Sequence, residues 1–308
     1  MTRVAAALAR AALFRTAAAL ARAALFRTAA ALVLAACSRG HAPPGARHEA
    51  HRVVSVSPAI TETLFAVGAG GLVVGRSRFC DWPPEATKIP TVGGVIDADF
   101  EAIVQLAPDL VIGSPGPAST RLAEKLTPFG IPTWFPDIDS LASIDAMISG
   151  VGERTGHAAE ARQVVASIDA HTTAVERSVA SEATQRVLMV LDVDPVVATG
   201  PKDFADDMLR RAGAANVVTV GASWQTLDFE QIAALDPDVV LDASTIASGG
   251  GPSKIHPDSP GWAHVRAARE GHVLTLDDPR VLRPGPRVAE GLASLARALH
   301  PHASVPSW

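Results

Sequence analysis

Short apolar runs and amphipathic segments alternate along most of the chain, in the order that a parallel α/β fold requires. One unit of this pattern occurs twice. Residues 99–111 begin Asp-Phe-Glu, continue with apolar positions at helical spacing and end in Pro-Asp and an apolar run, and residues 228–240 repeat this with eight of thirteen positions identical. Each copy predicts a short helix capped by its aspartate and followed by a buried strand. The repetition predicts two similar lobes.

The first lobe is expected to cover residues 52–150. Residues 52–57 predict a strand, the next ten a helix that stops at a run of glycines, and residues 72–75 a second strand. The loop over residues 76–85 then carries two aromatic side chains among polar residues and prolines. Because strands and helices alternate, the sheet is predicted to be largely parallel.

A helical pattern separates the two lobes. It runs from about residue 140 to residue 179, and its last part, from residue 159, contains neither glycine nor proline. We assign residues 151–182 to a connecting helix that is stiff and leaves little room for hinge motion. The second lobe, residues 183–308, repeats the order of elements of the first. The predicted fold class is therefore α/β, with two similar lobes, central mostly parallel sheets and one long rigid helix between them.

The first 37 residues have the pattern of an export signal. Recurring arginines precede a short uncharged run that ends at Cys37, and this run is too short to span a bilayer as a helix. Leu34-Ala35-Ala36-Cys37 resembles the lipobox of bacterial lipoproteins, which implies that Cys37 is acylated; the alternative is an ordinary cleaved signal in which this cysteine is incidental. Residues 38–51 are rich in glycine, proline, alanine and histidine, and we expect a flexible tether.

Composition excludes several kinds of function. The net charge of −5 makes nucleic acid an unexpected partner, and the absence of tyrosine removes any mechanism that needs a phenol, including a tyrosine ligand to haem iron. The sequence contains neither a nucleotide-binding glycine loop nor the motif of a serine hydrolase or zinc protease. We therefore predict no catalytic residues, no metal site and no cofactor of the protein's own.

The positive signals are aromatic and arginine side chains in expected loops. Phe79 and Trp82 belong to the first lobe, Trp224 to the loop before the second repeat copy, and Arg283 to a segment with two further arginines near the C-terminus. For any one of these residues, packing explains the side chain as well as ligand contact does. Open α/β sheets bind ligands at the carboxyl ends of their strands, so two facing lobes would line one cleft with all of them.

The motifs together resemble a known family. Residues 57–62 (Ser-Pro-Ala-Ile-Thr-Glu), 81–84 (Asp-Trp-Pro-Pro) and 92–94 (Val-Gly-Gly), both repeat copies and residues 283–287 (Arg-Pro-Gly-Pro-Arg) are similar to the cobalamin-binding lipoproteins and periplasmic proteins that feed ABC importers. These belong to a class of periplasmic-binding-protein type with a helical backbone, whose members bind cobalamin, haem or ferric siderophores. The resemblance implies ligand binding in the cleft, without catalysis, and a cobalt corrinoid as the ligand.

The resemblance also implies roles for single residues. Phe79 and Trp224 correspond to aromatics that sandwich the corrin ligand, and Asp278 and Arg283 to a polar pair in the second lobe; the other candidate ligand contacts are Trp82, Ser57 and Pro58. Where cobalamin receptors have further tryptophans, after Val92 and at the loop of residues 113–114, this chain has glycine and serine. A ferric-siderophore or haem receptor of the same class therefore stays open as the alternative.

Glu101 and Glu230 occupy the same position in the two repeat copies. In the family, a matched glutamate on each lobe docks onto arginines of the two permease subunits. The alternative is that each acid only favours its helix dipole, by about 0.3 to 1 kcal/mol. We expect a monomeric, exported, membrane-anchored lipoprotein that meets a permease dimer. A secreted two-lobed enzyme and a lipoprotein that only scaffolds a partner are the other hypotheses.

Overall fold

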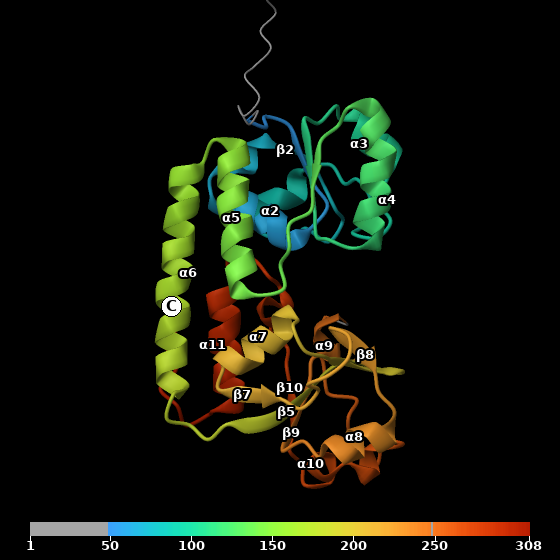
Figure 1. Ribbon diagram of the computed structural model, residues 1–308, viewed down its shortest axis with the longest axis vertical. Coiled ribbons are helices and arrows are strands. Elements are labelled where there is room, and N and C mark those ends of the chain that lie inside the picture. The colour runs from blue at the N-terminus through green and yellow to red at the C-terminus, as the bar shows by residue number, and fades with distance from the viewer. Residues whose placement is uncertain (1–48, 248) are drawn as a thin grey trace, which may run out of the picture. The chain divides into compact units, whose positions relative to one another are not determined.

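The computed structural model describes residues 49–247 and 249–308, which form one compact unit. It consists of two α/β lobes connected by long helices (Figure 1). The predicted signal, Cys37 and most of the predicted tether lie outside the described residues. Among the residues that the structure describes, none of the helices is long and apolar enough to cross a membrane.

The first lobe contains a four-stranded parallel sheet in the order β2-β1-β3-β4. Its strands are β1 (Val53–Ser55), β2 (Val73–Arg76), β3 (Leu110–Ile112) and β4 (Thr133–Trp134). Its helices are α2 (Pro58–Ala66), α3 (Phe100–Gln105), α4 (Pro117–Leu126) and the 3-10 turns η1 (Ala69–Leu72), η2 (Pro84–Lys88) and η3 (Thr127–Phe129). All three residues of β1 are buried, as expected for a central parallel strand covered on both faces.

The predicted helical connection consists of two helices, α5 (Leu141–Thr155) and α6 (Ala158–Val179). Gly156 ends α5 with a φ of 75°, a left-handed conformation that glycine adopts without steric cost. Gly152 allows α5 and α6 to approach closely, because a Cβ there would lie 2.5 Å from the Cβ of Ala161. The two helices therefore turn back on each other and pack side by side (Figure 1).

The second lobe contains a mixed sheet in the order β10-β9-β5-β6-β8, with β7 also paired to β5. Its strands are β5 (Gln185–Val193), β6 (Val196–Thr199), β7 (Ala214–Asn216), β8 (Trp224–Thr226), β9 (Val239–Asp242) and β10 (Val273–Thr275). Its helices are α7 (Phe204–Arg211), α8 (Phe229–Leu235), α9 (Ser244–Ala247), α10 (Arg266–Arg269), α11 (Val288–Leu299) and the turns η4 (Trp262–His264) and η5 (Pro279–Leu282). Strands β6 and β8 are antiparallel and have no counterpart in the first lobe.

The repeated sequence unit forms the same structure in both lobes. Asp99 caps α3 by accepting a hydrogen bond from the Ala102 amide (3.0 Å), and Asp228 caps α8 by accepting one from the Gln231 amide (2.7 Å). The strand after each helix, β3 or β9, pairs in parallel with the first strand of its lobe. The prediction of two similar α/β lobes is confirmed at this level.

The likeness between the lobes extends to an arginine at the start of the first strand of each lobe. In the first lobe, the Arg52 guanidinium donates to the Leu106 carbonyl at the end of α3 (2.6 Å), and the Asp109 carboxylate accepts from the Arg52 amide (2.9 Å). The second lobe makes the same two contacts, at 2.6 and 3.1 Å, through Arg186, Leu235 and Asp238. In each lobe, the arginine and the aspartate of the Pro-Asp pair therefore tie the end of the helix to the first strand.

The largest hydrophobic core runs through both lobes. It includes Ile60 and Leu64 on α2, Met147 on α5 and Ile168 on α6, and continues to Leu292 on α11. Helix α6, the long yellow-green helix of Figure 1, packs against both α5 and α11. Because interiors of this kind are close-packed, the shared core makes the connection between the lobes stiff. The sheet faces away from it have separate, smaller cores.

Candidate ligand-binding site

The loop after β2 presents Phe79 to solvent. Buried contacts hold the loop from inside: the Thr61 hydroxyl donates to the Cys80 sulfur (3.1 Å), and Ser77 Oγ accepts from the Phe79 amide (3.2 Å). Cys80 is fully buried, whereas Phe79 is 52% exposed. The guanidinium of Arg78, which pairs with Asp97, lies 5.5 Å from the centre of the Phe79 ring and restricts its position.

Trp224 is the corresponding exposed aromatic of the second lobe. It lies on the edge strand β8, opposite Thr199 of β6, so the prediction that it belongs to a loop is wrong. The reason is that β8 has only three residues, too few for its alternation to be visible in the sequence. The indole is 65% exposed and its Nε1 donates to Asp203 Oδ2 (3.0 Å). Burial raises the pKa of Asp203, although the hydrogen bond from Trp224 opposes the rise. Sequence reasoning missed Asp203, whose only signal was its place before a helix.

Ser57 and Pro58 connect β1 to α2. Ser57 is 1% exposed, and its hydroxyl shares a hydrogen bond of 2.7 Å with that of Ser114, which follows β3. Pro58 is half-buried and occupies the first turn of α2, where its missing N–H costs nothing. The carboxyl ends of two neighbouring parallel strands therefore meet here, as expected for an open α/β sheet.

The structure gives Asp278 and Arg283 separate partners and does not pair them with each other. Asp278 binds the Arg280 guanidinium through two hydrogen bonds of 2.9 and 2.8 Å, and Arg280 also contacts Glu290 (2.5 Å). Burial alone would raise the pKa of Asp278, but the hydrogen bonds from the Arg280 side chain and backbone outweigh it and hold the pKa below its usual range. Arg280, and not Arg283, is therefore the charged partner of Asp278.

Arg283 belongs to a group of charges that connects the two lobes, which we call the interlobe cluster: Glu62, Asp81, Arg283 and Arg287. Glu62 Oε1 accepts hydrogen bonds from Arg283 Nη1 (2.7 Å) and Arg287 Nη2 (2.8 Å), and Oε2 accepts one from Arg287 Nε (2.8 Å). Arg283 Nη1 also donates to Asp81 Oδ1 (3.0 Å). Two acids of the first lobe therefore face two arginines of the second.

The interlobe cluster is balanced in charge but unequal in burial. The Glu62 side chain is 2% exposed, those of Arg283 and Arg287 21% and 23%, and that of Asp81 68%. Burial alone would lower the pKa of Arg283, but the hydrogen bonds that it donates to Glu62 and Asp81, together with the negative charge of these acids, outweigh burial and raise the pKa. Sequence reasoning missed this cluster, because Glu62 and the arginines lie more than 200 residues apart.

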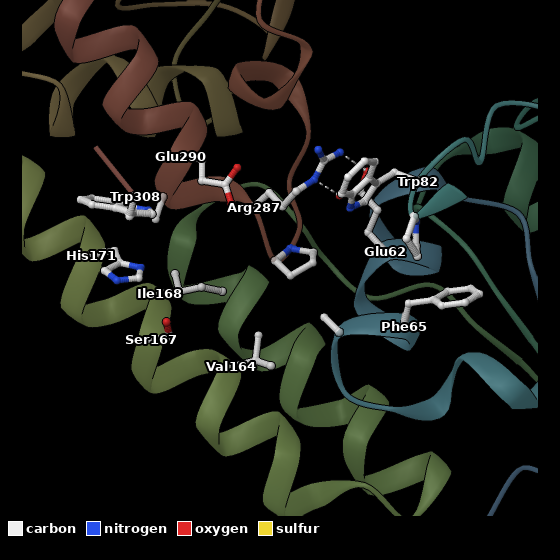
Figure 2. A pocket seen from close by; sticks show the side chains of 14 residues that line it. Glu62, Phe65, Trp82, Val164, Ser167, Ile168, His171, Arg287, Glu290 and Trp308 are labelled. Atoms are coloured by element: carbon white, nitrogen blue, oxygen red, sulfur yellow. Dashed lines mark hydrogen bonds and ion pairs between the residues drawn. The ribbon is translucent and has the colours of Figure 1, made fainter. Parts of the chain in front are cut away.

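A pocket of about 480 Å³ lies beside this cluster (Figure 2). One wall carries Trp82, whose ring lies 4.6 Å from the Arg287 guanidinium carbon, and another carries Trp308 stacked on His171. Helix α6 supplies aliphatic side chains to the lining, including Val164 and Ile168. Of the predicted ligand residues, Trp82 lines this pocket. Four others, Phe79, Trp224, Asp278 and Arg283, are not among the described residues that line it. A pocket of this volume suits a drug-sized molecule, which is smaller than a corrinoid.

Glu101 and Glu230 are exposed in the first turns of α3 and α8. The structure thus places the two candidate docking acids identically within the two repeats. For metals, residues 49–247 and 249–308 contain no group of three or more His, Cys, Asp or Glu side chains that could hold an ion.

The sequence model of a family, described as "Periplasmic binding protein", matches residues 53–279, which is most of the length of the chain. This chain belongs to the periplasmic binding protein family. Its members and structural relatives bind solutes and are not enzymes, so the family assignment removes the enzyme hypothesis. It also confirms the predicted fold class.

Three relatives indicate where this binding protein stands within the family. It is 28% identical to an uncharacterized ABC transporter substrate-binding lipoprotein of Bacillus subtilis, YvrC, over 83% of this chain and 82% of the other. It is 24% identical to the vitamin B12-binding protein of Vibrio parahaemolyticus, over 80% and 88% of the two chains. The solved structure of the periplasmic haem-binding protein RhuT from Roseiflexus superposes with a TM-score of 0.71 at 28% identity, covering 82% of this chain and 98% of that chain.

These relatives confirm the resemblance predicted from the motifs. The protein is therefore a substrate-binding protein of the type that serves ABC transporters for vitamin B12, haem or ferric siderophores. Cobalamin-binding and haem-binding proteins both occur among its relatives, so the choice between these ligands depends on the residues of the site.

Proposed function

We propose that this binding protein captures cobalamin or a related corrinoid between its two lobes and delivers it to the permease dimer of an ABC importer. The observation that carries the proposal is the pair of exposed aromatic side chains Phe79 and Trp224, one from each lobe, in a chain similar to a vitamin B12-binding protein. A flat macrocycle offers two faces for stacking, and aromatic rings from two lobes suit it.

Polar contacts complete the proposed site. Arg283 keeps 21% of its side chain exposed and lies between the lobes, so it can donate to an oxygen at the edge of the ligand. Asp278 is held in place by Arg280 and supports the same segment. Ser57 and Pro58 lie between the end of β1 and the start of α2, where Ser57 hydrogen-bonds to Ser114. Trp82 packs on Arg287 and fixes the position of the interlobe cluster.

Delivery and anchoring form the second part of the proposal. Glu101 and Glu230, one per lobe, give a pseudo-twofold pair of acids that fits arginines on a twofold permease dimer. Acylation of Cys37 would hold the protein at the membrane on the periplasmic side or at the cell surface, as a monomer. The similarity to a lipoprotein of the same transporter type supports this arrangement.

A haem or ferric-siderophore receptor is the second candidate, and the similarity to RhuT favours it. Because the chain contains no tyrosine, a haem iron bound here would need another ligand, such as histidine.

Calorimetric titration of the purified protein with cyanocobalamin, haemin and a ferric siderophore tests the choice. We expect heat of binding with cyanocobalamin at micromolar concentration. Binding of haemin or the siderophore without binding of cyanocobalamin would overturn the corrinoid assignment. The visible absorption of the freshly purified protein gives an independent check, because corrinoids, haems and ferric siderophores absorb at different wavelengths.

A further inference from the structure

One nitrogen of Arg283 donates hydrogen bonds to two carboxylates that differ strongly in burial. Its Nη1 donates to Glu62 Oε1 at 2.7 Å and to Asp81 Oδ1 at 3.0 Å. Glu62 is buried and also holds Arg287, so its displacement would leave the Arg287 guanidinium without a counter-charge and Arg283 with Asp81 alone. Asp81 is 68% exposed at its side chain, and water can replace its contact at little cost. Asp81 is therefore the partner of Arg283 that an incoming group would displace.

The charges around the proposed ligand residues are compensated. Within the interlobe cluster, Glu62 and Asp81 balance Arg283 and Arg287. The neighbouring arginines of the same loops are paired as well, Arg78 with Asp97 and Arg280 with Asp278 and Glu290. An anionic ligand group would thus meet arginines whose charge is already neutralised.

The candidate ligands differ in the charge of the groups at their edges. Haem carries two carboxylates at its edge, whereas the edge of a corrinoid is decorated with uncharged carboxamides. A carboxylate that approaches Arg283 must displace Asp81 or lie next to its negative charge, and like charges at such short range repel. A carboxamide oxygen can accept a hydrogen bond from the same guanidinium without this repulsion.

We infer that Asp81 sets the charge preference of the site: by occupying Arg283, it disfavours carboxylate-bearing tetrapyrroles and favours ligands with an uncharged amide edge. Asp81 lies two residues after Phe79, in the loop that presents that ring. The inference rests on the proposed function, because it requires the ligand to lie against Phe79 and Arg283.

The test is a comparison of two ligands with three proteins. Asp81→Asn keeps the shape of the side chain and an acceptor oxygen but removes the charge. Glu85→Gln is the matched control, since Glu85 is an exposed acid in the turn that follows the same loop. Dissociation constants for haemin and cyanocobalamin are measured by quenching of tryptophan fluorescence, at low and at moderate salt.

We expect Asp81→Asn to lower the ratio of the haemin to the cyanocobalamin dissociation constant about three- to fivefold at low salt, an effect of the size that an exposed ion pair permits. Moderate salt should shrink the change, because it screens exposed charges. Glu85→Gln should leave the ratio at its wild-type value. A merely structural role of Asp81 would weaken both ligands together and would not depend on salt.

Three results would overturn the inference. If cyanocobalamin binds but Asp81→Asn leaves the ratio unchanged, or Glu85→Gln shifts it equally, the role of Asp81 is wrong while the proposed function stands. If neither cyanocobalamin nor haemin binds to the wild-type protein, the proposed function fails, and the inference fails with it.

Discussion

Glu62 of the first lobe and Arg287 of the second share two hydrogen bonds, each 2.8 Å long. A bidentate contact of this kind fixes both the distance and the orientation of the two groups. Glu62 stands in the second turn of α2, the helix that follows β1, and Arg287 is the N-cap residue of α11. The contact therefore connects α2 of one lobe to the start of α11 of the other, next to the proposed ligand residues Trp82 and Arg283.

Replacing Glu62 with glutamine should destabilise the protein. The variant leaves Arg287 without a counter-charge and Arg283 with only the exposed Asp81, and the removal of one partner of a buried ion pair costs about 2 to 4 kcal/mol when part of the site is open to water. The free energy of unfolding is measured by urea titration followed by tryptophan fluorescence. Glu124→Gln, an exposed acid on α4, is the control and should change it by less than about 0.5 kcal/mol. Equal stability of both variants would show that the cluster does not hold the lobes.

The sequence was informative wherever a local signal decides the structure. The aspartate caps of α3 and α8 depend on residues within one helical turn, and both were visible in the pattern. The division of the connection into two helices was not predicted: one helix was assigned to residues 151–182, whereas Gly156 ends α5 and α6 begins at Ala158.

Other features depend on contacts between distant residues and leave no local trace. Strand β8 is three residues long with both of its end side chains exposed, so its alternation could not be distinguished from a loop. Likewise, the partners of Arg283 were not predictable, because only the packing of the two lobes brings Glu62 and Asp81 to it. Motif resemblance marked Asp278 and Arg283 as a polar pair of the second lobe but did not identify the acids that contact Arg283.

The stability of the protein should depend on pH through Asp145 on α5. Burial, reinforced by the nearby Asp169 carboxylate and opposed by Arg211, raises the pKa of Asp145 to about 6. Between about pH 4 and 6 the folded protein thus keeps a proton that the unfolded chain has lost, and the free energy of unfolding falls as the pH rises through this window.

Asp145→Asn removes the free-energy cost of holding a charged carboxylate at this position at neutral pH. One carboxylate oxygen of Asp145, Oδ1, is buried without a hydrogen-bond partner, but the residue as a whole is only partly buried. Because water screens part of the charge, we expect the variant to be more stable than the wild type by about 1 kcal/mol at pH 7. The difference should vanish near pH 4, where the aspartic acid is also neutral. Urea titrations across this range measure it, and Asp137→Asn, an exposed acid ahead of α5, should show no such pH-dependent gain. A constant difference at all pH values would contradict the explanation.

Trp224→Ala should weaken ligand binding, because stacking of an aromatic ring on a flat ligand contributes about 0.5 to 1.5 kcal/mol beyond the buried area. Trp224→Phe is the informative companion, since it keeps an aromatic face but loses the hydrogen bond to Asp203. We expect the phenylalanine variant to bind cyanocobalamin with an affinity between those of the wild type and the alanine variant. Calorimetry measures all three proteins. Wild-type affinity in the alanine variant would remove Trp224 from the site.

Glu101→Ala combined with Glu230→Ala should separate docking from binding. Both acids are exposed and stand at the same position of the two repeats, away from the proposed ligand residues, so cyanocobalamin affinity should stay at the wild-type value. Loss of two charge contacts with the permease should slow uptake at least tenfold when measured with vesicles or cells that contain the cognate transporter. Each single variant should show a smaller defect, because one lobe still docks. Dipole effects alone would lower the stability of α3 and α8 slightly and leave transport intact, so a normal uptake rate in the double variant would reject the docking role.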